Sequence, residues 1–113
     1  NYEKSLPIML ETLRRDFIMS IQVLKVSGTS NVNAVSEAVI KNVVSDSIVH
    51  VDCIGVKASY TVTKALIQVT EYLVKNCYKF NMRPYYIKVQ VNGQDEEQKI
   101  KTAIRWTLIA KKK

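Results

Sequence analysis

The spacing of hydrophobic residues changes several times along this chain, and the order of those changes limits the possible fold more than any other feature. A period of two is typical of strands and a period near 3.6 is typical of helices, so the alternation between them predicts the element order β-α-β-α-β-β. The predicted strands are 21–26, 48–54, 85–91 and 98–110, and the predicted helices are 32–43 and 60–76. This order predicts an α+β protein, a two-layer sandwich with helices on one face of a sheet of about four strands.

Local signals set the ends of these segments. The turn residues at 29–31 offer an N-cap to the helix that follows. The nearly continuous apolar run at 48–54 predicts a central strand buried on both faces. We expect a connecting loop at 56–59, with Ser59 as the cap of the second helix, and a break at 81–84. Asn92-Gly93 and the acidic residues after it predict a turn between the last two strands.

Residues 1–18 form a separate pattern. Their apolar side chains fall on one helical face, which predicts an amphipathic helix that extends a domain over 19–113. The residues on this face are Leu6, Met9, Leu10, Leu13 and Phe17. Three interpretations of the segment stay open: part of the core, a regulatory extension, or a stretch upstream of an internal start at Met19.

Composition narrows the class of protein. With 113 residues, 47% of them hydrophobic and 24% charged, the chain has the size and composition of one globular domain. It has no apolar run of about 18 residues, so we expect no membrane span. Its two cysteines, Cys53 and Cys77, do not make a disulfide scaffold. We therefore expect a reducing compartment, the cytoplasm or, in a eukaryote, the nucleus.

Candidate catalytic groups are sparse. The lone histidine, His50, lies inside a predicted strand without a positioned partner, and the cysteines lack the spacing of a metal site. The glycines at 28, 55 and 93 are isolated, so no phosphate-binding glycine loop is present. We expect no enzyme activity, no cofactor and no metal.

The formal net charge of +7 favours a polyanionic partner. Alternation in the last two strands separates a core set, with Tyr85, Ile87, Val89 and Val91 on the first strand, from an outer set, and we expect the outer sets of both strands to share one face. That predicted face carries Tyr86, Lys88, Lys99, Lys101 and Arg105. Lysine and arginine can contact phosphates, and an exposed tyrosine can stack on a base. The pattern equally fits an ordinary solvated sheet face.

Several short motifs resemble those of a known family. The stretches 24–27, 33–35, 54–58 and 62–65 and the closing residues 102–105 are similar, in order and spacing, to the stage V sporulation protein S family of the Alba-like superfamily. The resemblance covers about residues 21–110. It implies a dimeric β-α-β-α-β-β fold related to archaeal chromatin proteins that bind DNA and RNA, with basic residues of two loops and the final hairpin facing the nucleic acid.

By this resemblance, the chain is expected to be a non-enzymatic protein that binds RNA or DNA with low sequence specificity, as a homodimer. The predicted nucleic-acid-binding residues are Lys25, Lys57, Ser59, Tyr86, Lys88, Lys99, Lys101 and Arg105, supplemented by the lysines at 111–113. The first loop, 28–31, lacks the lysines that Alba proteins have there, and residues 1–18 have no counterpart. The alternative is a protein-interaction or scaffold module that self-associates through residues 1–18.

Overall fold

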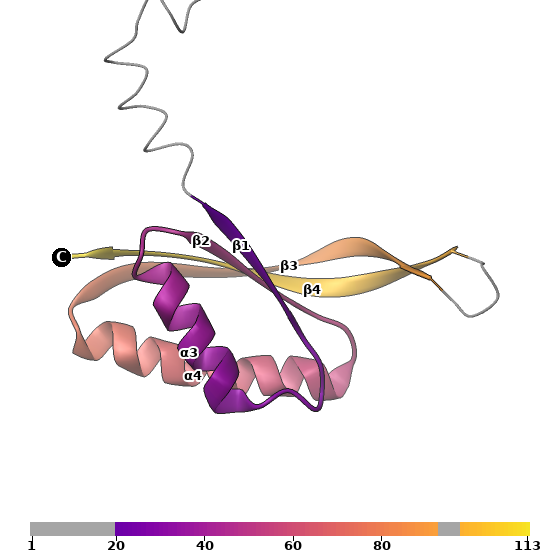
Figure 1. Cartoon of the computed structure of the whole chain (residues 1–113), viewed down its shortest axis with the longest axis horizontal. Coiled ribbons are helices and arrows are strands. Elements are labelled where there is room, and N and C mark those ends of the chain that lie inside the picture. The colour runs from indigo at the N-terminus through magenta and orange to yellow at the C-terminus, as the bar shows by residue number, and fades with distance from the viewer. Residues whose placement is uncertain (1–19, 93–97) are drawn as a thin grey trace, which may run out of the picture.

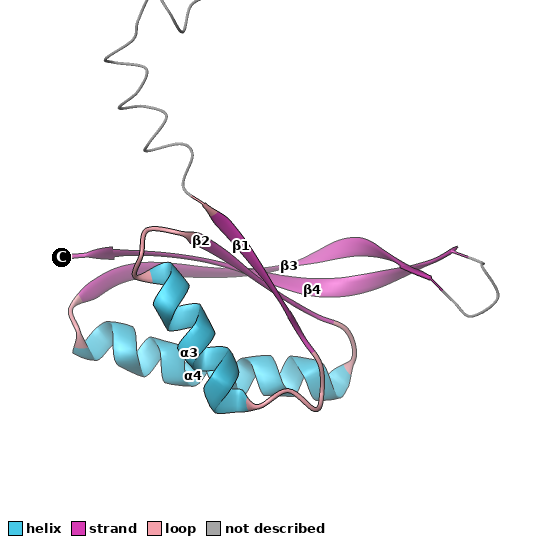
Figure 2. Cartoon of the chain, in the orientation of Figure 1, coloured by secondary structure: helices cyan, strands magenta, loops and turns pink. Residues whose placement is uncertain are grey.

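The computed structural model describes residues 20–92 and 98–113, which form a two-layer α+β sandwich. The elements are β1 (Ile21–Val26), α3 (Val32–Val43), β2 (Ile48–Cys53), α4 (Val56–Lys75), β3 (Tyr78–Asn92) and β4 (Gln98–Lys112). One sheet has the strand order β1-β2-β4-β3, in which only β1 and β2 are parallel. Both helices cover the same face of it (Figure 2). The predicted element order and fold class are confirmed; the helix predicted for 1–18 lies outside the described residues.

The core lies between the helices and the two central strands. Val39 and Val43 of α3 and Val69 and Leu73 of α4 are fully buried against alternate residues of β2 and β4. Because valine is a poor helix former, α3 depends on this packing and on its N-cap. The Asn31 Oδ1 supplies that cap by accepting a hydrogen bond of 3.0 Å from the backbone N–H of Ala34. Neither described helix is long and apolar enough to cross a membrane.

Three sequence predictions are wrong in detail. Helix α4 begins at Val56, directly after Gly55, so 56–59 is not a loop. Gly55 has a φ of 89°, which a residue with a side chain rarely adopts. The Ser59 hydroxyl donates to the Gly55 carbonyl at 2.8 Å from inside the first turn, so Ser59 does not cap the helix. Strand β2 is not buried on both faces, since Ile48 and His50 on its helix-free side are only half-buried.

The predicted break at 81–84 is also wrong, because β3 runs without interruption from Tyr78 to Asn92. Pro84 fits within it because β3 is an edge strand, where a residue without an N–H need not lose a ladder hydrogen bond. Strands β3 and β4 have 15 residues each, whereas β2 has 6. The pairing of β2 with β4 ends at Cys53 and Ile104. The β3–β4 hairpin therefore projects beyond the helices (Figure 1).

Candidate nucleic-acid interface

The strand register aligns rows of side chains on the sheet face that no helix covers. One row contains Lys25, Asp52, Arg105 and Tyr85, and the next contains Val23, His50, Thr107 and Arg83, in the order β1, β2, β4, β3. These residues alternate with the buried side chains of Val49, Val51 and Leu108, so they point away from the helices. We call this surface the helix-free face.

An ion pair lies at the centre of the helix-free face. The Arg105 Nε donates to the Asp52 Oδ1 at 2.7 Å, and Nη2 donates to Oδ2 at 2.9 Å. Asp52 is only 8% exposed, so this two-pronged contact compensates a carboxylate that lies almost out of water. The hydrogen bond to Asp52 raises the pKa of Arg105. Arg105 was predicted to bind phosphate, but the structure has its guanidinium engaged by this partner; phosphate binding by Arg105 stays a prediction.

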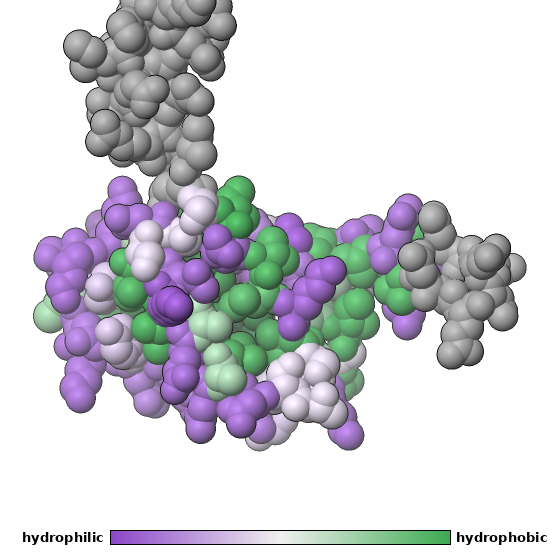
Figure 3. Space-filling view, in the orientation of Figure 1, coloured by the Kyte–Doolittle hydropathy of each residue, from purple (hydrophilic) through white to green (hydrophobic). Residues whose placement is uncertain are grey.

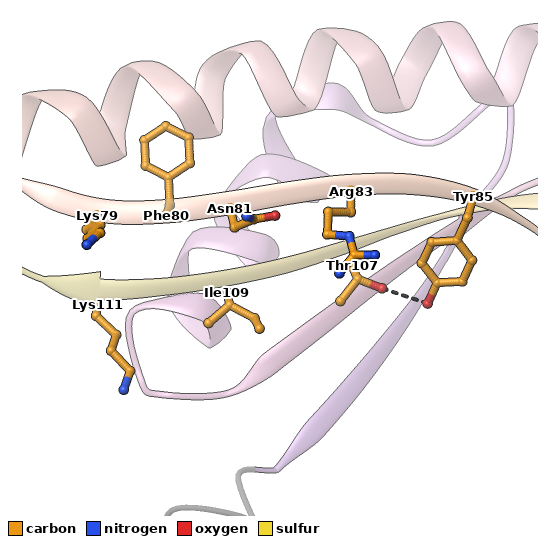
Figure 4. A pocket seen from close by; sticks show the side chains of 8 residues that line it. All are labelled: Lys79, Phe80, Asn81, Arg83, Tyr85, Thr107, Ile109 and Lys111. Atoms are coloured by element: carbon orange, nitrogen blue, oxygen red, sulfur yellow. Dashed lines mark hydrogen bonds between the residues drawn. The ribbon is translucent and has the colours of Figure 1, made fainter.

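Polar side chains extend this pair across the sheet. The Thr107 Oγ1 lies 2.9 Å from the His50 Nδ1 and 2.8 Å from the Tyr85 hydroxyl, the second contact being visible in Figure 4. Burial lowers the pKa of His50 and the positive charge of Arg105 lowers it further, while Asp52 opposes them. The imidazole is therefore neutral near pH 7. It acts here as a hydrogen-bonding group and adds no positive charge to the face.

A shallow groove follows β3 and β4 along the helix-free face. It is lined by Lys79, Phe80, Asn81, Arg83, Tyr85, Thr107, Ile109 and Lys111. In Figure 4 Phe80 points toward the helix layer, whereas Arg83, Tyr85 and Lys111 lie on the opposite side of the hairpin. Sequence reasoning missed Lys79 and Arg83 because the strand was expected to start only at residue 85. The alternation of polar residues at 79, 81 and 83 was the signal that could have found them.

The helix-free face is strongly basic over the described strands. Its basic residues are Lys25, Lys79, Arg83, Lys99, Lys101, Arg105 and Lys111. Asp52 is the only acidic residue in the strands that the structure describes, and Arg105 neutralises it. Of the remaining cations, Lys25 lies across from Asp52, and the others have no acidic cross-strand neighbour in the described strands. This arrangement suits a ligand that carries many negative charges.

The predicted grouping of the hairpin residues is wrong. Tyr85 pairs with Arg105, so Tyr86 pairs with Ile104 and Lys88 with Thr102, on the helix side of the sheet. The Lys88 Nζ donates to the Thr102 Oγ1 at 2.7 Å. Tyr86 is 77% exposed, but it lies on the opposite face from Lys101 and Arg105. Tyr85, which was expected in the core, takes the place of Tyr86 as the exposed tyrosine of the helix-free face.

The two loops near Lys57 pack together. A Cβ placed on Gly28 would lie 2.5 Å from the Lys57 Cβ, so only glycine allows the first loop to approach the start of α4 this closely. Hydrogen bonds hold the loop, with the Ser27 N–H donating to the Ser30 Oγ at 2.9 Å. The exposed Lys57 therefore lies at the start of α4, in contact with a loop that is held in place by hydrogen bonds. Lys25 and Gly28 line a notch at the base of the hairpin, so the structure brings the first loop, Lys57 and the hairpin to one end of the sheet.

Within residues 20–92 and 98–113, no group of three or more histidine, cysteine, aspartate and glutamate side chains could hold a metal ion. Cys53 is buried, and its Sγ lies 3.6 Å from the Ser59 hydroxyl, while Cys77 is exposed at a turn.

Comparison with known proteins agrees with this geometry. The model of the stage V sporulation protein S (SpoVS) family matches residues 22–111. Alba from Thermoplasma volcanium superposes with a TM-score of 0.53 at 15% identity, over 80% of this chain and 99% of that one. A precorrin-6y C5,15-methyltransferase from Geobacter metallireducens gives a TM-score of 0.38 at 15% identity, over 81% of this chain and 44% of that one, and supports no inference. No curated protein matches the sequence.

Proposed function

Because the chain belongs to the stage V sporulation protein S family and has the fold of Alba, we propose that it is a non-enzymatic protein that binds RNA or DNA. The observation that carries the proposal is the helix-free face, where basic side chains from β1, β3 and β4 surround one neutralised carboxylate. Lysine and arginine contacts to phosphates supply sequence-independent affinity. Low sequence specificity follows, since few groups on this face could distinguish one base edge from another.

The interface that we propose extends beyond the groove. Lys99 and Lys101 continue the basic face along the projecting hairpin, and Lys25 and Lys57 stand at the loop end of the sheet. A nucleic-acid backbone lying across these positions would contact cations along its length. Tyr85 is 43% exposed in the groove and offers a ring on which a base could stack.

A second copy of the chain, bound through the helix layer, would double the basic surface. The outer side of α4 exposes Tyr60 (63%) and Ile67 (54%), and beside it a small groove is lined by apolar atoms of Met82 and Trp106. Burying such side chains in a homodimer removes apolar surface from water. Two basic faces in one dimer would also bind one polyanion with avidity.

Fluorescence anisotropy against salt concentration tests the proposal. Labelled single-stranded RNA and duplex DNA are titrated into the wild type, into Arg83→Gln with Lys111→Gln, and into a control, Lys41→Gln with Lys75→Gln. Each variant loses the same charge, but the control sites lie on the helices. The first variant should lower the slope of log affinity against log salt by about 1.4–1.8, at roughly 0.7–0.9 per phosphate contact, and the control should not.

Two results would contradict the proposal: no binding at low salt, or equal losses in the two variants. The alternative function, a protein-interaction module, is supported by Ile21 and Val23, which are exposed on edge strand β1, the first described strand of the chain. Self-association that does not depend on salt and is lost on deletion of residues 1–18 would favour that alternative. Sedimentation of the same samples reports the oligomeric state.

A further inference from the structure

A notch opens where the first two strands end and the hairpin continues. Strands β1 and β2 stop at Val26 and Cys53, whereas β4 runs on past Ile104 with only β3 beside it. The notch between the ends of β1 and β2 and the continuing hairpin has a volume of about 380 Å³. Its apolar walls are formed by Val26, Ile54, Val89, Val91 and Ala103. Figure 3 shows hydrophobic side chains gathered beside β1 toward the base of the hairpin, bordered by hydrophilic ones.

Positive charge borders this apolar notch. Lys25 itself lines it, and so does Asp52, whose carboxylate is paired with Arg105. Lys101 is the cross-strand neighbour of Val89, and Lys99 is the cross-strand neighbour of Val91. Side chains paired in this way have Cβ atoms only about 5 Å apart. Apolar walls with a cationic rim match a group that is apolar on its faces and joined to phosphates at its edge.

The notch also contains polar groups that could bond the edge of a planar ligand. The loop residues Ser27 and Gly28 line it together with the valines, and so does Gln90, although strand alternation turns the Gln90 side chain to the same side as that of Lys88. A serine hydroxyl both donates and accepts hydrogen bonds, and each of these residues also has one backbone donor and one backbone acceptor. A nucleobase has an apolar face and an edge of donors and acceptors, so its chemistry fits both parts of the lining.

We infer that the notch holds one unpaired nucleobase of a single-stranded nucleic acid, with the flanking phosphates on Lys25, Lys99 and Lys101. This inference rests on the proposed function and names its substrate class. A base within a duplex is stacked and paired, and it enters a pocket only after that stacking and pairing are lost. A protein with this notch therefore binds single strands more tightly than duplexes, whereas a protein that contacted only phosphates would bind both.

The ligand-side test compares a single-stranded DNA 12-mer with an oligomer of the same length made of abasic nucleotides. Both carry the same phosphates, but only the first has bases. The wild type should bind the abasic oligomer about tenfold more weakly, with an unchanged salt slope. The same 12-mer as RNA tests which sugar is preferred, and its duplex should bind more weakly than the single strand.

The protein-side test fills the notch with Ala103→Leu. This variant should lose about tenfold in affinity for the single strand and nothing for the abasic oligomer, while a matched variant outside the notch, Thr102→Leu, should bind both as the wild type does. Thermal unfolding of each variant reports its fold. Because Tyr85 in the groove could also stack on a base, the abasic comparison is repeated on Tyr85→Ala, which lies outside the notch. A preference for the 12-mer that persists in Tyr85→Ala supports the notch even if Ala103→Leu does not fold, and one that disappears overturns the inference. Equal affinity of the wild type for the 12-mer and the abasic oligomer would overturn the inference while the proposed function stands. Failure of every oligomer to bind at low salt would overturn both.

Discussion

Replacing Arg105 by glutamine should destabilise the fold by leaving the Asp52 carboxylate without its cation. Asp52 is 8% exposed, and the side chain of Arg105 is 25% exposed. Removing one partner of a fully buried pair costs about 3–5 kcal/mol, and an exposed pair contributes less than about 1 kcal/mol. This pair lies between those limits, so we expect a loss of about 2 kcal/mol in the free energy of unfolding. For a domain of this size, that loss lowers Tm by roughly 8–16 °C in a thermal unfolding experiment.

The same substitution should raise the pKa of His50. In the wild type this pKa lies below 6.5, because burial and the charge of Arg105 lower it more than Asp52 raises it. Arg105→Gln removes one lowering cause and keeps the raising one. His50 is the only histidine in the chain, so its imidazole resonance can be followed by NMR through a pH titration without assignment ambiguity.

The sign of the pH dependence follows from this shift. A histidine whose folded pKa is lowered binds fewer protons in the folded state than in the unfolded state, so stability falls as the pH drops through 6.5 toward the folded pKa. The part of the acid destabilisation that comes from His50 should therefore be smaller in Arg105→Gln than in the wild type. Unfolding measured at pH 7.5 and pH 5.5 tests this difference.

Lys101→Gln is the matched control, because it removes the same charge from the same face and Lys101 is not a partner of Asp52. It should leave the pKa of His50 in place and change the free energy of unfolding by no more than about 0.5 kcal/mol. If Arg105→Gln behaves like this control in both measurements, the ion pair does not form in solution and the reasoning is refuted.

Two further predictions concern the helix α3 cap and the N-terminal segment. Asn31→Ala should lower the free energy of unfolding, measured by urea denaturation, by about 1 kcal/mol, because the backbone N–H of Ala34 loses its hydrogen bond to the cap. An unchanged urea midpoint would show that water replaces the cap at no cost. Deletion of residues 1–18 should leave cooperative thermal unfolding intact, since the described residues already enclose a core of fully buried valines and leucines; a broad, non-cooperative transition would place that segment in the core.

The element order could be predicted from the sequence because each helix or strand has the hydrophobic period of its own type. The predicted ends of α4 and β3 were wrong where a residue had two possible structural roles. Ser59 has the chemistry of a cap, but Gly55 begins the helix four residues earlier and leaves the Ser59 hydroxyl to bond back along it. Pro84 is a common strand breaker, and only the position of β3 at the sheet edge makes it acceptable.

The faces of the hairpin were harder to predict than its strands. Alternation separates Tyr85 from Tyr86 but does not say which of them shares a face with Arg105, because that depends on a register set by the turn. A shift of one residue exchanges the two sets, as the pairing of Tyr85 with Arg105 shows. The prediction of a basic hairpin face therefore joined residues that lie on opposite sides of the sheet.

The ion pair illustrates how a partner can be inferred even when the register is unknown. Asp52 lies in an apolar strand whose neighbours are buried, and a carboxylate in such a place requires a cation or several donors. Within the described strands, a cation from β4 lies directly across from it, and the long, forked side chain of Arg105 can satisfy both oxygens at once. A buried acid in a predicted strand thus indicates that one basic residue of the neighbouring strand is structural. Replacing Arg105 therefore affects the stability of the fold as well as any phosphate contact, so its effect on binding must be measured together with its effect on unfolding.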